Sequence, residues 1–465
     1  MTIENLRGKL VAVLGYAQEG MAITSYLIKH GIKPVLFDIK PWQEWEDSEK
    51  QSIRNLGLTV IFGPGYLNEL KGFDVAFRSP GISCLEPELI EQQRQGMLLT
   101  SQINWFMHHC PAKVIGVTGT KGKGTTTTLI HEMLKAHFEK SGKGRAYLTG
   151  NIGKQQPLEI LDELEPNDWV AYEMSSFQLQ DLDISPHIGV ALMVTEDHLD
   201  YHKNLQEYRN AKEAIVKFQT EKDFAIINAD YPASIEIGNK GKAKKYFVTL
   251  QGPVEFGSYL SGDTLYLSLN SEAAMPIVNI SELKLRGRHN LENVSAASLA
   301  ATLAGVSIVT IRQVLKNFSG LEHRLEFIGE FKGIKFYNDS FSTNPETAIA
   351  AIRAFSEPEI LILGGSSKNS DFNDLGKAIA GANNIHAIIY IGQEGEKIKH
   401  AVENAGASNI KIMQNAKNMA EIFEQIKQVA SEGAVVLLSP ACASFGMFKN
   451  YKDRGEQFRS FAKQY

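Results

Sequence analysis

The chain has 465 residues, enough for about three domains, and its 43% hydrophobic and 22% charged residues are typical of a globular protein. The formal net charge is −5 and no long basic block occurs, which argues against a nucleic-acid partner. Three widely spaced cysteines indicate neither a disulfide framework nor a zinc cluster, and the lack of a signal-peptide core or of a run of ~18 apolar residues predicts a cytoplasmic protein without a membrane partner.

The first third of the chain alternates strand and helix signals. An apolar strand at 10–14 is followed by a turn at 15–20, a helical pattern at 21–29 and a second strand at 34–38. This is the βαβ pattern of a doubly wound α/β domain, in which ligands bind at the carboxyl ends of the strands. The turn has Ala17 where a dinucleotide fingerprint has glycine, so a nucleotide or phosphate site and a purely structural turn both remain open.

The most informative segment is 116–126, a glycine-rich turn between an apolar strand and a helical pattern. Small residues let backbone N–H groups approach phosphate oxygens, and the helix N-terminus adds partial positive charge. Lys123 would reach the terminal phosphates of ATP. The next residue is Gly124 rather than serine or threonine, so Thr125 supplies the Mg²⁺-binding hydroxyl one position later. The pattern predicts an ATP-using enzyme, with a glycine-rich turn that binds nothing as the alternative.

Two further strands of the middle third end at polar side chains. Segment 168–173 closes on Glu173, and segment 188–194 is followed by four polar residues that end at His198. Ligands of open α/β sheets sit at the carboxyl ends of strands. We therefore expect Glu173 and His198 to lie where the phosphate loop opens.

A lysine interrupts the apolar face of a helical pattern at 205–218. At about 100° per residue, the apolar residues from Leu205 to Phe218 share one face, and Lys212 falls between Leu205 and Tyr208 on that face. A lysine there is costly unless it extends to solvent, pairs or changes chemically. The pattern leaves open both an extended lysine and a lysine that works at a metal or phosphate site.

The last third has three apolar runs, at 360–363, 387–391 and 434–438, separated by helical patterns. They predict a second doubly wound domain. We therefore divide the chain into residues 1–100, 101–320 and 321–465.

Several motifs resemble one family in their order and spacing. They are the loop at 119–125, the segments 172–178 and 195–200, Gly-Arg-His-Asn at 287–290, His-Arg at 323–324 and Asn-Asp-Ser at 338–340. Together they resemble the Mur ligases over essentially the whole chain. Segments 79–82 and 439–444 look most like the members that add glutamate to UDP-N-acetylmuramoyl-L-alanine.

The resemblance implies a three-domain α/β fold. It consists of an N-terminal Rossmann-like domain that binds the UDP substrate, a central P-loop ATPase-like domain and a C-terminal Rossmann-like domain that brings the amino acid. The implied enzyme is an ATP-dependent amide ligase of cytoplasmic peptidoglycan precursor synthesis, acting through an acyl phosphate. Its expected cofactors are ATP, two Mg²⁺ ions and a CO₂-derived carbamate on Lys212. Its expected partners are UDP-N-acetylmuramoyl-L-alanine and glutamate, taken as D-glutamate, and we expect a monomer.

The resemblance also implies roles for individual residues. The catalytic residues are Lys123, His198 and Lys212. The ATP-binding residues are Gly119, Thr120, Lys121, Gly122, Lys123, Gly124, Thr125, Thr126, Asn290, Asn293, Arg324 and Asp339. The UDP-substrate residues are Gln18, Glu19, Asp38, Ser79, Gly81, Asn151 and Ser175. The glutamate-binding residues are Thr343, Lys368, Ser444 and Tyr451. The metal ligands are Thr125, Glu173, His198 and Lys212.

Two positions depart from the family pattern. Phe341 replaces the usual lysine, and Ser366 stands near a common aspartate, so one cation and one anion are missing and L-glutamate stays an alternative. A folylpolyglutamate-synthase-like ligase shares the phosphate loop but lacks a UDP-binding domain before it. A dinucleotide-dependent oxidoreductase would explain only the turn at 15–20. A non-catalytic nucleotide-binding module would tolerate loss of metal ligands, and none is lost.

Overall fold

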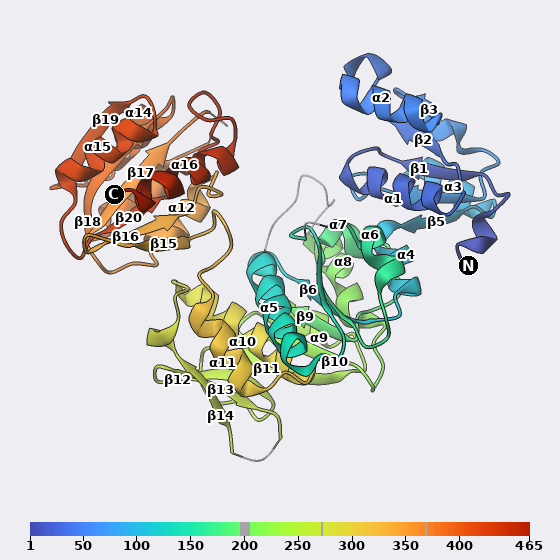
Figure 1. Cartoon of the computed structure of the whole chain (residues 1–465), viewed down its shortest axis with the longest axis horizontal. Helices are drawn as coiled ribbons and strands as arrows, with labels where there is room; N and C mark the ends of the chain where they lie inside the picture. The colour runs from blue at the N-terminus through green and yellow to red at the C-terminus, as the bar shows by residue number, and fades with distance from the viewer. Residues whose placement is uncertain (154, 196–204, 271–272, 368–369) are drawn as a thin grey trace. The chain divides into compact units, whose positions relative to one another are not determined.

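Three β-sheets organise the chain in the computed structural model, which describes residues 1–153, 155–195, 205–270, 273–367 and 370–465 (Figure 1). The sheets lie in sequence within residues 11–101, 113–279 and 326–438. Most strand pairs are parallel and helices connect them, so the expected α/β class is confirmed. Short 3₁₀ helices occupy Glu4–Leu6, Trp42–Glu44, Tyr66–Leu70, Leu161–Glu163 and Ile280–Glu282.

The first sheet has the strand order β3-β2-β1-β4-β5, and all its strand pairs are parallel. Its strands are β1 (Val11–Leu14), β2 (Val35–Asp38), β3 (Thr59–Phe62), β4 (Val75–Arg78) and β5 (Leu98–Ser101). Its helices are α1 (Gln18–Lys29), α2 (Asp47–Leu56), α3 (Pro87–Arg94) and α4 (Gln102–His109). The chain order reverses beside β1, so the turns after β1 and β4 are neighbours at the carboxyl edge. Open α/β sheets bind ligands at such an edge.

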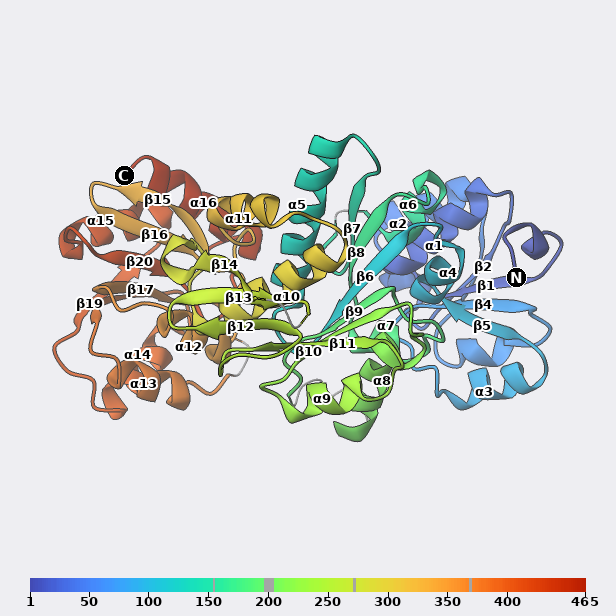
Figure 2. The same cartoon turned by 90° about the horizontal axis from the view of Figure 1, so that it is seen from below.

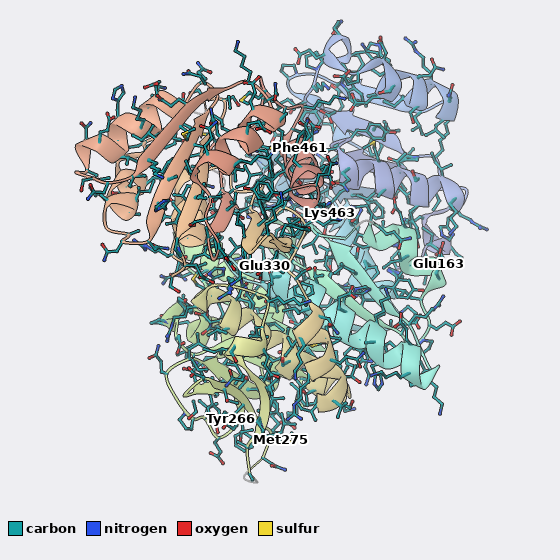
Figure 3. The ribbon with its side chains drawn as sticks, turned by 60° about the vertical axis from the view of Figure 1, so that its left-hand side comes forward. Glu163, Tyr266, Met275, Glu330, Phe461 and Lys463 are labelled. Atoms are coloured by element: carbon teal, nitrogen blue, oxygen red, sulfur yellow. The ribbon has the colours of Figure 1, made fainter. Side chains whose placement is uncertain are left out.

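The second sheet has the order β14-β13-β12-β11-β10-β9-β6-β8-β7. Its strands are β6 (Lys113–Thr118), β7 (Ala146–Gly150), β8 (Trp169–Glu173), β9 (Ile188–Ala191), β10 (Phe224–Asn228), β11 (Lys244–Thr249), β12 (Gly257–Ser261), β13 (Thr264–Ser268) and β14 (Met275–Asn279). The helices here are α5 (Lys123–Ser141), α6 (Pro157–Ile160), α7 (Ser176–Leu179), α8 (Leu205–Lys217), α9 (Pro232–Gly238), α10 (Arg288–Leu303) and α11 (Ile308–Asn317). Strands β7 to β12 pair in parallel, with β6 between β8 and β9 (Figure 2). Strand β13 is antiparallel to β12, and Tyr266, which is labelled in Figure 3, stacks on Tyr259 of β12.

The third sheet has the order β15-β16-β20-β17-β18-β19. Its strands are β15 (Glu326–Phe331), β16 (Ile334–Asn338), β17 (Glu359–Gly364), β18 (Ile385–Ile391), β19 (Lys411–Ala416) and β20 (Val435–Leu438). Its helices are α12 (Pro345–Ile352), α13 (Asn373–Ala380), α14 (Gly395–Asn404), α15 (Met419–Val429) and α16 (Tyr451–Lys463). Alternate residues of the central strands feed two separate cores, one with α12, α13 and α14 and the other with α15 and α16.

Contacts divide the chain into two compact units. The first comprises residues 1–277 and 292–311, and the second comprises 278–291 and 312–465. One apolar core of the first unit contains residues of both its first and second sheets, and the ring of Phe106 meets Tyr172 edge-on at 5.7 Å. The boundaries drawn at residues 100 and 320 stay predictions.

The predicted elements differ from the structure mainly at their ends. Helix α1 begins at Gln18, inside the predicted turn. The residue before it, Ala17, has an extended backbone and is the N-cap of the helix. Strand β9 ends at Ala191, three residues before the predicted end. Phe218 was expected on a buried face but is 41% exposed, because α8 ends at Lys217 and the Phe218 N–H donates to the Ser185 hydroxyl instead.

Candidate active site

The glycine-rich loop after Thr118 connects β6 to α5, as the sequence predicts. Gly122 precedes the first helical residue and has φ = 88°, a left-handed conformation that favours glycine. The Lys123 ammonium donates to the carbonyl oxygens of Gly119 and Thr120, both at 3.1 Å. The lysine therefore lies against its own loop, at the helix N-terminus where an anion is favoured.

The loop is packed tightly against helix α10. A Cβ atom added at Gly122 would lie 2.2 Å from the Asn293 side-chain oxygen, and that oxygen accepts a hydrogen bond from the Thr126 hydroxyl. Three residues predicted to bind ATP are thus brought together. Of the remaining loop residues, Lys121 is exposed, whereas Gly124 and Thr125 are buried in the first turn of α5.

A second set of contacts joins the loop to the segment after β9. The Thr120 N–H donates to the Met193 carbonyl at 2.7 Å, and the Thr195 N–H donates to the Thr120 hydroxyl at 2.9 Å. The same hydroxyl lies 3.0 Å from the Tyr208 hydroxyl of α8. These contacts fix where the chain leaves β9, immediately before the segment that contains His198, which lies outside the described residues.

Lys212 is 1% exposed, which rules out the extended, solvent-reaching lysine. Its ammonium donates to the Thr118 hydroxyl at 3.2 Å and to the Gly119 carbonyl at 3.1 Å, and it lies over the Tyr208 ring at 4.7 Å from the centroid. Lys123 and Lys212 therefore both donate to the Gly119 carbonyl oxygen. The structure brings these two predicted catalytic residues together.

Two predicted metal ligands lie at the same edge of the second sheet. Glu173 is the last residue of β8 and pairs in register with Val117 of β6, just before the loop. Thr125 is 6% exposed in α5. Among the described residues, no group of three histidine, cysteine, aspartate or glutamate side chains is placed to hold a metal ion. Thr125 and Lys212 do not belong to these four residue types, and His198 lies outside the described residues. The predicted metal site therefore stays a prediction.

Asp38 and Ser79 shape the turn after β1. The Asp38 carboxylate accepts the N–H groups of Tyr16 and Lys40 at 2.9 and 2.8 Å, and the Ser79 hydroxyl donates to the Gly15 carbonyl at 3.1 Å. Both predicted UDP-substrate residues thus hold the turn in place. Gln18 at the start of α1, Gly81 in the turn after β4 and Asn151 in the turn after β7 are exposed.

Glu19 faces another protein side chain. Its carboxylate accepts a hydrogen bond from the Gln178 amide at 2.7 Å, and burial raises the pKa of the Glu19 carboxyl above its usual value. Ser175, another predicted UDP-substrate residue, caps α7: its hydroxyl accepts the Gln178 N–H at 3.2 Å, and its own N–H donates to the Gln178 side-chain oxygen at 3.0 Å. Gln178 lies in the family motif, but we did not predict it as a site residue.

A buried arginine makes a further connection that the sequence did not reveal. Arg78, the last residue of β4, is 0% exposed and pairs with Asp181 at 2.9 Å. Its guanidinium also donates to the carbonyls of Ile82 and Phe177. An arginine that ends an apolar strand just before a predicted binding turn is the only sequence signal for this pair.

In the second unit, two predicted residues, Arg324 and Tyr451, lie against Phe341. The Arg324 guanidinium lies over the Phe341 ring at 4.7 Å, and the Tyr451 ring meets Phe341 edge-on at 5.0 Å. Arg324 thus places a cation beside the position where the family usually has lysine. Thr343 is half-buried before α12, Ser444 is buried after β20, and Lys368 lies outside the described residues.

Asp339 is buried beneath this group. Burial raises the pKa of its carboxyl to about 7, although the Ser439 hydroxyl and the Leu325 N–H both donate to it. Arg454, which the sequence did not suggest, is 0% exposed and holds the loops on either side: it donates to the carbonyls of Ser340 and Cys442 at 2.9 and 3.2 Å.

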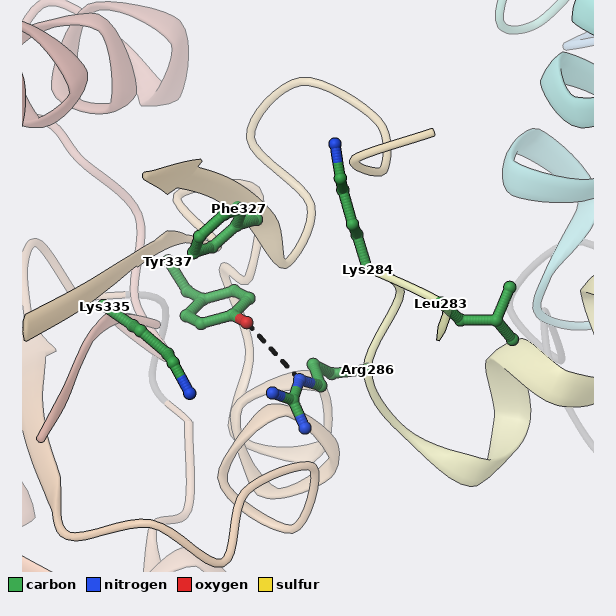
Figure 4. Close-up of a pocket in the computed structure, with 6 residues that line it drawn as sticks. All are labelled: Leu283, Lys284, Arg286, Phe327, Lys335 and Tyr337. Carbon is green, nitrogen blue, oxygen red and sulfur yellow. Dashed lines mark hydrogen bonds between the residues drawn. The ribbon is translucent and has the colours of Figure 1, made fainter. Parts of the chain in front are cut away.

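A cavity of about 150 Å³ in the second unit does not include any predicted site residue (Figure 4). It is lined by Leu283, Lys284, Arg286, Phe327, Lys335 and Tyr337. Arg286 and Lys335 both pair with Glu357, so part of its positive charge is neutralised. Asn290 lies nearby in sequence and donates to the Arg286 carbonyl at 2.7 Å.

No helix in the described part of the chain combines the length and apolar character needed to cross a membrane.

Comparison with known proteins gives matches along the chain. A model of the Mur ligase middle domain matches residues 117–301, and a model of the Mur ligase glutamate ligase domain matches residues 323–442. The curated UDP-N-acetylmuramoylalanine–D-glutamate ligase of Clostridium kluyveri is 35% identical over 98% of this chain and 96% of its own length. That of Thermoanaerobacter sp. strain X514 is 35% identical over 98% of both chains.

Solved structures with low sequence identity share the fold. The UDP-N-acetylmuramate-alanine ligase of Thermotoga maritima has a TM-score of 0.57 at 16% identity and is matched over 98% of this chain and 99% of its own. A MurF ligase of Thermotoga maritima in complex with ADP has a TM-score of 0.55 at 15% identity, over 100% of this chain and 97% of its own.

Proposed function

The chain belongs to the Mur ligase family, and from this premise we propose that it adds D-glutamate to UDP-N-acetylmuramoyl-L-alanine with cleavage of ATP to ADP and phosphate. Relatives that carry this activity in their names match nearly the whole chain, which supports this member of the family over the others. The product is a precursor of peptidoglycan.

The proposed reaction joins an amine to a carboxylate, which is a poor electrophile. Transfer of the γ-phosphoryl group of ATP to the acceptor carboxylate gives an acyl phosphate and ADP. The amine of glutamate attacks the carbonyl carbon, loses a proton, and phosphate leaves as the amide forms. Catalysis of this kind depends mainly on positioning and on neutralising phosphate charge.

The observation that carries the proposal is the convergence of Lys123 and Lys212 on the Gly119 carbonyl, each at 3.1 Å. Lysines at a glycine-rich loop and helix N-terminus suit a triphosphate, and we assign Lys123 to the transferred phosphoryl group. We further propose that CO₂ carboxylates the Lys212 amine in the active enzyme. The resulting carbamate would be an anion. This buried side chain would then attract bound Mg²⁺ instead of repelling it.

The donor chemistry of this edge fits Mg²⁺. The Thr125 hydroxyl and the Glu173 carboxylate are hard oxygen donors, the kind that Mg²⁺ prefers, and His198 is the proposed ligand of a second ion. Bound Mg²⁺ would neutralise charge on the phosphates. Thr125 and Glu173 would orient the ion, and Lys123 would hold the phosphoryl oxygens.

Both units contribute proposed ligand contacts. In the first, a Rossmann-like sheet would hold the UDP part through the turns after β1 and β4, while Asn151 and Ser175 of the P-loop ATPase-like sheet would contact the rest of that substrate. Asn293 of the first unit and Asn290, Arg324 and Asp339 of the second are proposed ATP contacts. Thr343, Lys368, Ser444 and Tyr451 of the Rossmann-like second unit are proposed glutamate contacts.

The test is phosphate release by the purified protein with ATP, Mg²⁺ and UDP-N-acetylmuramoyl-L-alanine, with D-glutamate, L-glutamate or neither. We expect release with D-glutamate only. Release with L-glutamate only would keep the mechanism but reassign the amino acid, in line with the Phe341 and Ser366 departures. No release with either amino acid would overturn the proposed substrate pair.

A further inference from the structure

Two turns of the first sheet are connected to one short segment of the second. The turn after β1 reaches it through Glu19 and Gln178, and the turn after β4 reaches it through Arg78 and Asp181. The segment, 175–181, begins with Ser175 and contains helix α7. All of these residues belong to the first unit, so the contacts are internal to one compact body.

The contact from Glu19 continues to Ser175 without a break. The Gln178 amide nitrogen donates to Glu19 at 2.7 Å, and the amide oxygen of the same side chain accepts from the Ser175 N–H at 3.0 Å and lies 3.2 Å from the Ser175 hydroxyl. An amide has distinct donor and acceptor ends. Glu19 can accept only from the nitrogen, so it determines which end of Gln178 faces Ser175.

The charge of Glu19 excludes a simple role beside phosphate. A carboxylate facing a diphosphate would repel it, whereas this carboxylate turns to Gln178 in a half-buried position. The Glu19 side chain is thus used to hold Gln178, and any contact of this residue with the diphosphate would come from its backbone.

We propose that Glu19 is a positioning residue: it fixes the Gln178 amide and, through it, the Ser175 turn that receives the acceptor end of the UDP substrate. The inference rests on the proposed function and adds a coupling between the two ends of that substrate's site. Loss of Glu19 frees the Gln178 side chain to rotate, and rotation takes the amide oxygen away from the Ser175 N–H that donates to it.

The test uses four variants with steady-state kinetics and with calorimetry of UDP-N-acetylmuramoyl-L-alanine binding. Glu19→Ala should raise the KM and Kd for this substrate about tenfold and leave the KM for ATP unchanged. Glu19→Gln keeps an acceptor oxygen and should stay within about twofold of the wild type. Gln178→Glu places two carboxylates in contact and should impair binding at least as much as Glu19→Ala.

The decisive variant is the double substitution E19Q/Q178E. It reverses the direction of the hydrogen bond between positions 19 and 178. The amide at position 19 donates to the carboxylate at position 178, and this carboxylate still accepts from the Ser175 N–H. Binding should recover to within about threefold of the wild type. Kinetics of Glu19→Ala equal to the wild type, or a double variant no better than Gln178→Glu, would overturn the inference.

Asp162→Ala is the matched control. Asp162 pairs with Lys29 at 2.6 Å and with His30, and so connects the other end of α1 to the second sheet's part of the chain. Its loss should lower the melting temperature slightly without changing the KM for the UDP substrate. If it raises that KM as Glu19→Ala does, the Glu19 effect is merely structural and the inference fails. A wild-type protein without ligase activity would instead overturn the proposed function.

Discussion

Lys123 and Lys212 share one acceptor but differ in the chemistry we expect of them. Lys123→Ala should lower ligase activity by about 10³-fold or more, because the charge on the transferred phosphoryl group loses its partner. Binding of UDP-N-acetylmuramoyl-L-alanine, measured by calorimetry, should change little. Activity within tenfold of the wild type would contradict the assignment of this loop.

Lys212→Ala should also cripple the ligase, but part of its activity should return with added acetate or formate. A small carboxylate can enter the space left by the side chain and replace the anionic group of the proposed carbamate. Lys217→Ala, which changes an exposed lysine of the same helix, is the control and should have little effect. Loss of activity without rescue would favour an unmodified Lys212.

Glu359 gives a prediction about stability. It is 0% exposed, and burial raises its pKa to about 9. Because the pKa of Glu359 is higher in the folded than in the unfolded state, its contribution to stability is fully present below about pH 4.5. That contribution is lost as the pH rises through about 9.

Glu359→Gln should therefore raise the unfolding free energy by several kcal/mol at pH 8 and flatten its pH dependence, because each pKa unit corresponds to about 1.4 kcal/mol. The two proteins should differ little at pH 4, where the carboxyl is protonated in both states. Urea unfolding across this pH range measures both effects. A variant as pH-dependent as the wild type would show that Glu359 is already ionised in the folded protein.

At the scale of elements, helix α5 has left-handed glycines at both ends. Gly122 packs against Asn293, whereas nothing lies within 4 Å of a Cβ added at Gly142, with φ = 65°. Gly142→Ala should cost about 1 kcal/mol of stability from backbone strain alone. Gly122→Ala should cost more and, unlike the control, should raise the KM for ATP at least tenfold, because the loop must move. Equal KM values for ATP would contradict this packing argument.

The elements that the sequence predicts best are those with local signals. The apolar runs of β17, β18 and β20 and the loop before α5 could be located from residue order alone. The family resemblance is confirmed, and the burial of Lys212 excludes one of the two alternatives that the helical pattern left open. The Glu19–Gln178 contact could not be predicted, because its partners lie 159 residues apart and glutamate and glutamine side chains are ordinarily solvated. The stacking of Arg324 on Phe341 could not be predicted either, because only the fold brings these two side chains together.

At the scale of the whole molecule, the two units carry different optical probes. All four tryptophans, Trp42, Trp45, Trp105 and Trp169, belong to the first unit. Tryptophan fluorescence should therefore follow unfolding of the first unit alone, while far-ultraviolet circular dichroism follows both. At pH 8, Glu359→Gln should raise the circular dichroism transition by about 10 °C or more, at about 2–4 °C per kcal/mol, and leave the fluorescence transition in place. Equal shifts in both signals would mean that the units unfold together.

The bridges at Glu19 and Arg78 determine where this chain can be recombined with a relative. A crossover near residue 100 would take Arg78 and Asp181 from different proteins. With a relative that has no carboxylate at that position, the fully buried guanidinium would lose its partner at a cost of about 3–5 kcal/mol. A crossover after residue 181 transfers both bridges intact with the turns that they hold. For making hybrid ligases with a new nucleotide-sugar substrate, the segment to exchange is therefore 1–181 rather than the first sheet alone.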